Sequence, residues 1–599
     1  MKHGLIVQAI IVVAVIVLSL APGGAAAPEP YLVLDIQPGS AWSNASELAA
    51  MGDMLFFGAN DGSHGQELWK SDGSEAGTVL VKDINPGSDG SSPAELVSMG
   101  STLFFAAMDA SHGYELWKSD GTAAGTVLVK DINAAGGSYP SQLLVHDGTL
   151  FFVADDGTHG YELWKSDGTA AGTALVKDVN PGAASGLDSI SALASIGEGL
   201  FFHADDGAHG DELWKSNGTE AGTVLVRDIY DLGSSAPRNL TAMNNIVYFT
   251  VDYPGLGREL WKSYGTEAGT ILVKDINPGS GDASPVNLLA VNSMLFFAAN
   301  DGTHGQELWK SDGTTAGTVL VKDINPGAGF SSPSGLADLN GTLYFRAIDD
   351  AHGDELWKSD GSGAGTVLVK DINPGSGGSV AGDSAVLDNA LYFRATDGAS
   401  GQELWKSDGT AAGTVLVKDI NPGAVDSGPG ELTVAGDTLF FSALDAAHGK
   451  ELWAFSSGPQ GGTCAAPLPI TCGEQVSGDT TGYANNCSTY GCSVWDESGP
   501  EVIYAFTLPA GGHYDVTATL SDLGGGDLDV FLLAAGGCQG GTCLDAGSYG
   551  NDQAAAAGVE PGTYYVAVDG WSGASGTYTL DLACTTVHKV YLPLLRSSH

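Results

Sequence analysis

The chain has 599 residues, of which 71 are acidic and 24 are basic, so its formal net charge is −47. This acidity excludes nucleic acid and anionic lipid as partners on long-range electrostatics, and it suits cations or basic partners better. The chain is longer than one ordinary hydrophobic core can support, so several structural units are predicted.

The first 27 residues have the pattern of a secretory signal peptide. Met1 to His3 precede an apolar run from Leu5 to Ala21, and small residues follow up to Ala27. An uncleaved anchor is the alternative, because about 17 apolar residues is the lower limit for spanning a bilayer. We expect cleavage near Ala26 or Ala27, a secreted or cell-surface protein, and no membrane insertion of the mature chain.

Residues 28–455 contain a nine-fold repeat of Glu-Leu-Trp, in which the tryptophan recurs every 47 to 50 residues. The tryptophans are Trp69, Trp117, Trp164, Trp214, Trp261, Trp309, Trp357, Trp405 and Trp453. A period of this size predicts one supersecondary unit copied many times, because a single unit cannot bury its own apolar faces.

Each repeat has the pattern of four short β-strands, as the segment from Glu95 to Asp131 illustrates. Gly and Asp turns separate the strands, and Leu-Phe-Phe and Leu-Trp place apolar groups on both faces. Such a sheet must be covered on both sides. The pattern therefore predicts an all-β fold, a nine-unit β-propeller of four-stranded blades. The lysines that recur after Trp and in Val-Lys-Asp are expected to pair with neighbouring aspartates.

The two ends of the repeat region complement each other. Residues Tyr31–Ile36 match the fourth strand of the other units, whereas the last unit stops at Glu451–Phe455 without that strand. We expect the opening segment to complete the last blade and close the ring. Nine blades exceed the usual four to eight, so an open solenoid and two smaller rings are alternatives.

The segment Glu307–Thr314, which reads Glu-Leu-Trp-Lys-Ser-Asp-Gly-Thr, carries a resemblance to a known family. It resembles the bacterial ELWxxDGT repeat family. The resemblance implies an exported bacterial protein whose molecular role is unassigned.

A second module is predicted after the linker, residues 456–463. All seven cysteines lie between Cys464 and Cys584. Cys487 with Cys492, and Cys538 with Cys543, are spaced for local disulfides in an oxidising compartment. Metal binding is the alternative, and one cysteine has no partner within the monomer.

Alternating strand patterns with Gly turns over residues 464–584 predict a small disulfide-containing β-sandwich. They resemble the bacterial pre-peptidase C-terminal domain, which implies an accessory role in secretion, attachment or substrate binding, with calcium bound in some members. Asp527 and Asp529 would point to the same side of a strand and are the candidate calcium ligands, with solvated aspartates as the alternative. No other cofactor is predicted, and the tail, residues 585–599, is given no role.

Seven units place a histidine in the turn before Glu-Leu-Trp. A ring of metal sites is one interpretation, but neighbouring sheets pack ~10 Å apart and zinc needs ligands at ~2 Å. We therefore expect turn histidines that pack against the following glutamate. The chain has no His-Glu-x-x-His and no Gly-x-Ser-x-Gly motif, so no catalytic residue is assigned from a motif.

The fifth unit departs from the others. Tyr230, Arg238, Tyr253, Arg258 and Tyr264 replace consensus residues or fall in variable segments. Aromatic rings and arginines are common contact residues, so these five form the candidate binding site, with neutral drift of one repeat as the alternative. The variable loops after Asn-Pro-Gly are expected to share one rim.

The leading expectation is a non-catalytic binding or adhesion protein that uses this rim to recognise an extracellular protein or polysaccharide. The alternative is an extracellular enzyme, a polysaccharide lyase or hydrolase or a protease-associated protein, with a site in the propeller mouth. Carboxylates, histidine and arginine clustered from different units at one mouth would favour the enzyme. The sequence leaves the oligomeric state open.

Overall fold

The structure is a computed structural model that describes residues 29–188, 193–197, 199–456, 468–480, 501–509, 513–521, 528–534, 543–547, 553–570 and 577–587. The predicted signal segment, the linker after Ser456 and the tail after Val587 lie outside these ranges. Every regular element within them is a β-strand, so none of these residues forms a helix long and apolar enough to cross a membrane.

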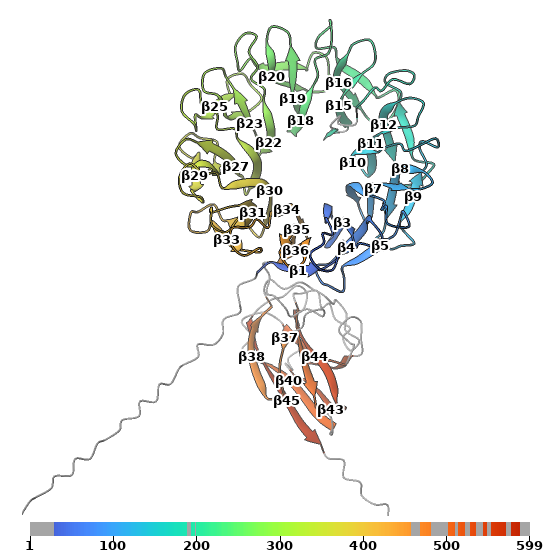
Figure 1. The fold of residues 1–599 in the computed structure, drawn as a ribbon, viewed down its shortest axis with the longest axis vertical. Helices are drawn as coiled ribbons and strands as arrows, with labels where there is room; N and C mark the ends of the chain where they lie inside the picture. Colours follow the sequence, from blue (N-terminus) through green and yellow to red (C-terminus); the bar gives the residue numbers. More distant parts are fainter. Residues whose placement is uncertain are drawn as a thin grey trace, which may run out of the picture.

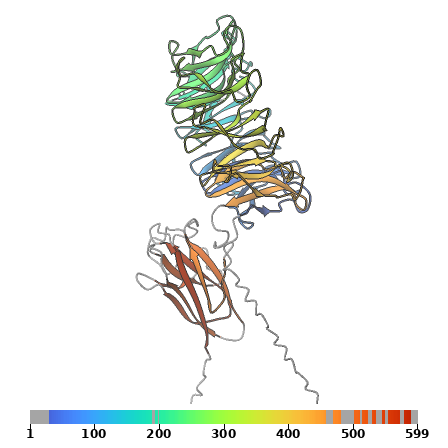
Figure 2. The same ribbon diagram turned by 90° about the vertical axis from the view of Figure 1, so that its left-hand side faces the viewer.

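Nine four-stranded antiparallel sheets, counted over the described residues, are arranged as the blades of a ring (Figure 1). The first strand of each blade lies toward the centre and the fourth lies at the periphery, and Figure 2 shows the ring nearly edge-on. The innermost strands of blades 1 to 9 are β2 (Ser46–Met51), β6 (Ala94–Met99), β10 (Ser141–His146), β14 (Ala194–Ile196), β18 (Arg238–Met243), β22 (Val286–Val291), β26 (Ser334–Leu339), β30 (Val380–Leu387) and β34 (Gly430–Ala435).

The second and third strands carry the apolar sequence of each repeat. The second strands are β3 (Met54–Asn60), β7 (Thr102–Asp109), β11 (Thr149–Asp155), β15 (Gly199–Asp205), β19 (Ile246–Tyr253), β23 (Met294–Asn300), β27 (Thr342–Asp349), β31 (Ala390–Ala395) and β35 (Thr438–Asp445). The third strands are β4 (Gln66–Ser71), β8 (Gly113–Ser119), β12 (Tyr161–Ser166), β16 (Asp211–Ser216), β20 (Gly257–Ser263), β24 (Gln306–Ser311), β28 (Gly353–Ser359), β32 (Glu403–Ser407) and β36 (Gly449–Ser456).

The outermost strands are short. They are β5 (Val79–Lys82), β9 (Val127–Lys130), β13 (Ala174–Lys177), β17 (Val224–Arg227), β21 (Ile271–Lys274), β25 (Val319–Lys322), β29 (Val367–Lys370), β33 (Val415–Lys418) and, for blade 9, β1 (Tyr31–Leu34).

The hydrophobic core lies between neighbouring blades. Phe56 and Leu68 of blade 1 form one buried cluster with Phe105 and Trp117 of blade 2. The same arrangement recurs around the ring, because successive strand residues point to opposite faces and both faces are apolar. The prediction of sheets buried on both sides is confirmed.

The repeated lysines bridge blades. Lys82 of blade 1 donates from Nζ to the carbonyl oxygen of Thr126 in blade 2 at 2.7 Å, and this ammonium lies 5.9 Å from the centre of the Trp117 ring. Lys118 donates in the same way to the carbonyl oxygen of Gly168 in blade 3 at 2.7 Å. The expected pairing of these lysines with adjacent aspartates is therefore wrong, because adjacent strand residues point in opposite directions.

The opening segment completes the last blade, as predicted. β1 pairs antiparallel with β36, so that Tyr31 lies opposite Ala454 and Leu32 lies opposite Trp453. Val33 of β1 is buried in one cluster with Phe57 of blade 1. Blades 9 and 1 are therefore in direct contact, and the nine units form one ring rather than two.

A buried glutamate from each Glu-Leu-Trp holds the loop that leads to the next blade. The Glu67 carboxylate accepts hydrogen bonds from the backbone N–H groups of Ile84 at 3.0 Å and Asn85 at 3.1 Å, and from the Ser91 hydroxyl at 2.6 Å. Burial raises the pKa of the equivalent carboxyls of Glu162 and Glu212 to about 7. These side chains fix where the loops enter the inner strands.

The C-terminal strands form two further sheets. A five-stranded sheet has the order β37 (Leu468–Pro469), β39 (Val502–Leu508), β44 (Gly562–Gly570), β41 (Leu528–Leu533) and β42 (Cys543–Gly547). A four-stranded sheet has the order β38 (Glu474–Asp479), β45 (Thr577–Val587), β40 (His513–Ser521) and β43 (Gln553–Val559). The sheets share one apolar core, so the predicted β-sandwich is confirmed.

A disulfide joins Cys472 to Cys584 across 112 residues of sequence. Neither cysteine was in the predicted local pairs, because spacing in the sequence does not reveal which strand ends meet. Cys487, Cys492 and Cys538 lie outside the described residues, as does the Cys543 side chain. A disulfide of this kind fits an oxidising compartment.

Substituting Val33 tests the contact between the last and first blades. Val33→Asp would bury a charge in that contact, so we expect the free energy of unfolding to fall by about 3 kcal/mol. Val79→Asp, at an exposed position of β5, is the matched control and should change it by less than about 0.5 kcal/mol. Urea denaturation followed by tryptophan fluorescence measures both, and equal stability of the two variants would contradict the closure.

The buried glutamates predict a pH dependence. Glutamate titrates at about 4.3 in an unfolded chain, whereas the pKa of Glu162 and of Glu451 is about 7 in the folded ring. Between these values the folded state holds more protons, so stability falls as pH rises from about 4.5 to about 7. Calorimetric melting temperatures should decrease over this range. Glu162→Gln should reduce the change of melting temperature with pH, and the surface substitution Glu220→Gln should not alter it. A melting temperature that rises with pH over this range would contradict the prediction.

Removing the disulfide should destabilise the C-terminal sandwich alone. Cys472→Ser with Cys584→Ser frees a loop of 112 residues, which the chain-entropy model values at roughly 3–5 kcal/mol. Calorimetry should show a lower transition for the sandwich and an unchanged transition for the ring. A simultaneous shift of both transitions would be the unexpected result.

Candidate functional site

Three positions come together at one mouth of the ring in seven of the nine blades. They are the first residue of the inner strand, the fifth residue of the second strand and the residue before Glu-Leu-Trp, and we call them the mouth positions. In blade 1, Ser46 lies opposite Gly58, and the Gln66 amide donates to the Ser46 hydroxyl at 3.3 Å. Other blades have small residues at the middle position, such as Ala106 and Ala298.

The basic residues of the ring follow a rule. Apart from the repeat lysines and Arg227, which takes the place of one of them, every basic residue between Tyr31 and Ser456 stands at a mouth position. These residues are Arg238, Arg258, Arg346, Arg394 and Lys450. In a chain with a net charge of −47, this placement marks the mouth as chemically distinct.

Blade 4 has a histidine and an aspartate at two mouth positions. His203, on β15, is 3% exposed, and its Nδ1 lies 2.7 Å from Asp211 Oδ1 at the start of β16. A carboxylate accepts hydrogen bonds, so Nδ1 is the donor to Asp211. This hydrogen bond fixes the orientation of the imidazole ring.

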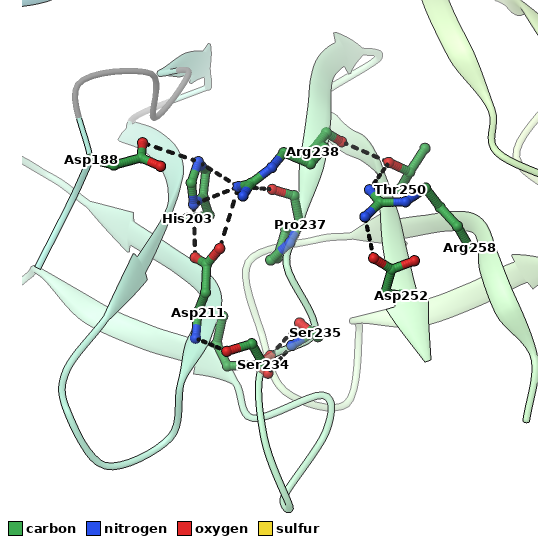
Figure 3. A network of polar contacts seen from close by, with 11 residues as sticks. Asp188, His203, Asp211, Ser234, Ser235, Pro237, Arg238, Thr250, Asp252 and Arg258 are labelled. Atoms are coloured by element: carbon green, nitrogen blue, oxygen red, sulfur yellow. Dashed lines mark hydrogen bonds and ion pairs between the residues drawn. The ribbon is translucent and has the colours of Figure 1, made fainter. Parts of the chain in front are cut away.

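Arg238 joins this pair from blade 5. Its Nη1 lies 2.9 Å from both ring nitrogens of His203 and 3.3 Å from Asp211 Oδ2. Asp188 adds a second carboxylate, with Oδ1 4.0 Å from His203 Nε2 (Figure 3). The base and the guanidinium come from different blades, so the ring itself brings them together.

The network continues along blade 5. The buried Thr250 hydroxyl lies 3.4 Å from the Arg238 carbonyl oxygen and 3.5 Å from Arg258 Nη1. Arg258 also forms an ion pair with Asp252 (Figure 3). One row of polar groups thus runs from Asp188 in blade 4 to Asp252 in blade 5.

The structure brings only part of the predicted fifth-unit site together. Arg238 and Arg258 share the network. The Tyr230 and Tyr253 rings make an edge contact with centroids 6.0 Å apart. Tyr264 follows the far end of β20 and lines a separate cavity of about 540 Å³. Arg258 lies at the start of β20 and Tyr264 follows its end, so the length of this strand separates the two residues although both belong to one unit.

His203 and Asp211 were missed by the sequence analysis. His203 directly follows the Leu-Phe-Phe run of its strand, at a position where several other units have a small residue, and this difference was the available signal. Its significance depends on Arg238, which lies 35 residues away and in the next blade.

The turn histidines bond to an aspartate three residues earlier. His64 Nδ1 lies 2.7 Å from Asp61 Oδ2, and this hydrogen bond raises the pKa of the imidazole. The expected packing against the following glutamate is wrong, because Glu67 is engaged by the loop backbone. The others are His112, His159, His209, His304, His352 and His448.

The calcium prediction stays a prediction. Asp527 lies outside the described residues, and Asp529 lies in β41 opposite Asp569 of β44. Within the part of the chain that the structure covers, no three His, Cys, Asp or Glu side chains are grouped to hold a metal ion.

Comparison with known proteins identifies the fold only. No protein-family model and no curated protein sequence matches the chain. A prolyl endopeptidase structure is 12% identical with a TM-score of 0.34, covering 61% of this chain and 56% of that chain. A puromycin hydrolase structure is 13% identical with a TM-score of 0.31, covering 64% of this chain and 61% of that chain. This chain therefore spans less than two thirds of either enzyme.

The C-terminal strands are similar to another solved structure. The pre-peptidase C-terminal domain of a collagenase from Bacillus anthracis is 16% identical with a TM-score of 0.14, covering 19% of this chain and 93% of that domain. The strand pairing defines the molecule as an all-β protein, a propeller of four-stranded blades followed by a β-sandwich.

The expectation of a non-catalytic binding or adhesion protein is corrected by these findings. The solved structures found for this chain are those of prolyl endopeptidases and a puromycin hydrolase, and none of those reported is an adhesion protein. At these identities the similarity concerns the fold and identifies no reaction. The chemistry has to come from the His203 network.

Proposed function

We propose that the protein is an exported enzyme that cleaves an acidic polysaccharide by β-elimination, with His203, Asp211 and Arg238 as its active site. The observation that carries this proposal is the 2.9 Å approach of a guanidinium from blade 5 to an aspartate-bound imidazole of blade 4. A base beside a fixed cation is what removal of a proton next to a carboxylate requires.

The reaction balances with these three groups. The carboxylate of a uronic acid draws the Arg238 guanidinium away from His203, which frees the Nε2 lone pair, and Arg238 stabilises the negative charge that develops on that carboxylate. His203 Nε2 takes the proton on the adjacent carbon, the electron pair forms a carbon–carbon double bond, and the bond to the glycosidic oxygen breaks. The protonated His203 then returns the proton to that oxygen, while Asp211 keeps the ring oriented.

Hydrolysis through a side-chain nucleophile has less support. Within the described ranges, His203 contacts Asp211, Asp188 and Arg238, and no serine or cysteine bonds to it. A general base without an adjacent nucleophile favours proton abstraction over acyl or glycosyl transfer to the protein.

The overall charge of the chain opposes a polyanion only at long range. At about 0.15 M salt, exposed charges separated by more than about 8 Å are largely screened. The local arginines at the mouth then decide the binding of a carboxylate.

Export and domain organisation complete the proposal. Residues 1–27 act as a cleaved signal peptide, residues 28–455 belong to the ELWxxDGT repeat family, and residues 464–584 form an accessory module that keeps the enzyme outside the cell. Support comes from the sequence resemblances and from the Cys472–Cys584 disulfide, which suits an oxidising compartment.

Substitution at His203 tests the function. The mature protein should release unsaturated products from polygalacturonate or alginate, measured as ultraviolet absorbance of the new double bond. His203→Ala should lower kcat by about 10²- to 10⁴-fold in a protein whose ring still unfolds in one cooperative transition, because the base is lost.

His209→Ala is the matched control, since its turn imidazole bonds to Asp206 in the same blade and should leave kcat unchanged. Arg238→Met should lower kcat and raise KM together. No turnover on any uronate polymer, or full activity in the His203 variant, would overturn the proposal.

A further inference from the structure

Large exposed apolar side chains recur in one class of loop. These loops, which we call rim loops, connect the outermost strand of one blade to the innermost strand of the next. Trp42 is 51% exposed, Tyr139 is 56% exposed and Phe330 is 55% exposed, each in a different rim loop. Leu232 and Val425 are exposed in two others.

The rim loops lie at the same mouth as the His203 network. Most are tied by a backbone hydrogen bond to the residue before Glu-Leu-Trp, as Ser138 N–H is to the Tyr114 carbonyl oxygen at 2.8 Å. In the Trp42 loop the Ser43 hydroxyl donates instead to the Lys450 carbonyl oxygen at 3.3 Å. In blade 4 the corresponding bond runs from Ser235 N–H to the carbonyl oxygen of Asp211 at 3.1 Å. The two backbone hydrogen bonds are equivalent. The loop that carries Tyr139 therefore has the same position relative to its blade as the loop next to Asp211 has relative to blade 4.

Tyr139 is held as a flat platform. Its ring stacks on Tyr114 with centroids 6.0 Å apart and an interplanar angle of 12°. The Tyr114 hydroxyl donates to the Ser92 carbonyl oxygen, which fixes the lower ring. Gly137 permits this approach, because a Cβ there would lie 2.7 Å from Tyr114 N. One face of Tyr139 is covered by Tyr114, and the ring keeps more than half of its surface exposed.

Trp42 is supported in a similar way. A Cβ at Gly449 would lie 2.8 Å from Trp42 Cδ1, so the indole rests against the glycine backbone. Gly449 precedes Lys450, a basic residue at a mouth position. Trp42 is thus an exposed aromatic surface supported by the backbone beneath it.

Resting on the proposed function, we infer that Trp42, Tyr139 and Phe330 are sugar-binding subsites that hold successive parts of the polysaccharide chain across the mouth. The three rings stand on three different rim loops, each between a different pair of blades, unlike the single contiguous apolar patch that protein partners use. A sugar ring presents one apolar face of C–H groups and a polar edge, and it matches a single exposed aromatic ring. A long polymer can contact several such rings at once, which raises its overall affinity.

Binding to a protein that cannot turn over its ligand tests the subsites. In the His203→Ala background, the affinity for polygalacturonate and alginate is measured by isothermal titration calorimetry, with neutral amylose for comparison. Trp42→Ala and Tyr139→Ala should each weaken the binding of a long polymer about tenfold. Val127→Ala, at an exposed apolar position of the outermost strand β9, is the control and should leave affinity unchanged.

Turnover measurements separate the two proposals. In the protein with His203 intact, the rim variants should raise KM for long polymers and leave kcat for short oligosaccharides unchanged. Unchanged affinity and KM in both variants would overturn the subsites and leave the active site standing. Polymer binding that depends on Trp42 and Tyr139, without any turnover, would support the subsites and refute the enzyme.

Discussion

The contact between neighbouring blades is the constraint on which the rest of the structure depends. Each sheet is apolar on both faces, so no blade can exist without a neighbour on each side. The repeat lysines strengthen this contact by reaching a carbonyl oxygen and a tryptophan ring of the next blade. Because β1 supplies the missing strand of blade 9, the same contact is also formed between the last blade and the first.

This constraint explains why the chemistry is confined to a few positions. The glutamate that holds each loop is the same in every unit, and the residues that pack between blades change only conservatively, as from Phe56 to Tyr248. Only the mouth positions and rim loops vary without disturbing the contact. A histidine and an arginine from two blades can therefore meet at the mouth while the framework stays regular.

The site is also an example of chemistry at a repeat interface. His203 and Arg238 occupy different mouth positions of different units, and neither blade alone supplies both a base and a cation. The repetition that makes the fold simple makes each blade a poor site, and departures from the repeat in two adjacent blades create a good one. The exposed aromatic rings on the rim loops extend the same principle to binding, because each blade contributes at most one.

The sequence alone determined the architecture of this protein. The period of the tryptophans, the strand patterns and the match between Tyr31–Ile36 and the missing last strand predict nine four-stranded blades completed by the first strand, and these features depend on local residues and on repetition. The partners of the lysines and turn histidines were predicted wrongly, because strand direction and loop hydrogen bonds decide them. Two of the five fifth-unit candidates, Arg238 and Arg258, fall in the network.

Only the tertiary structure decided which residues meet. His203 and Arg238 are 35 residues apart, and Cys472 and Cys584 are 112 apart, so sequence spacing gives no measure of their distance in space. The blade geometry brings each pair together, since it fixes which strand ends lie side by side. A repeat pattern therefore specifies the blade, and the packing of blades in a ring specifies the site.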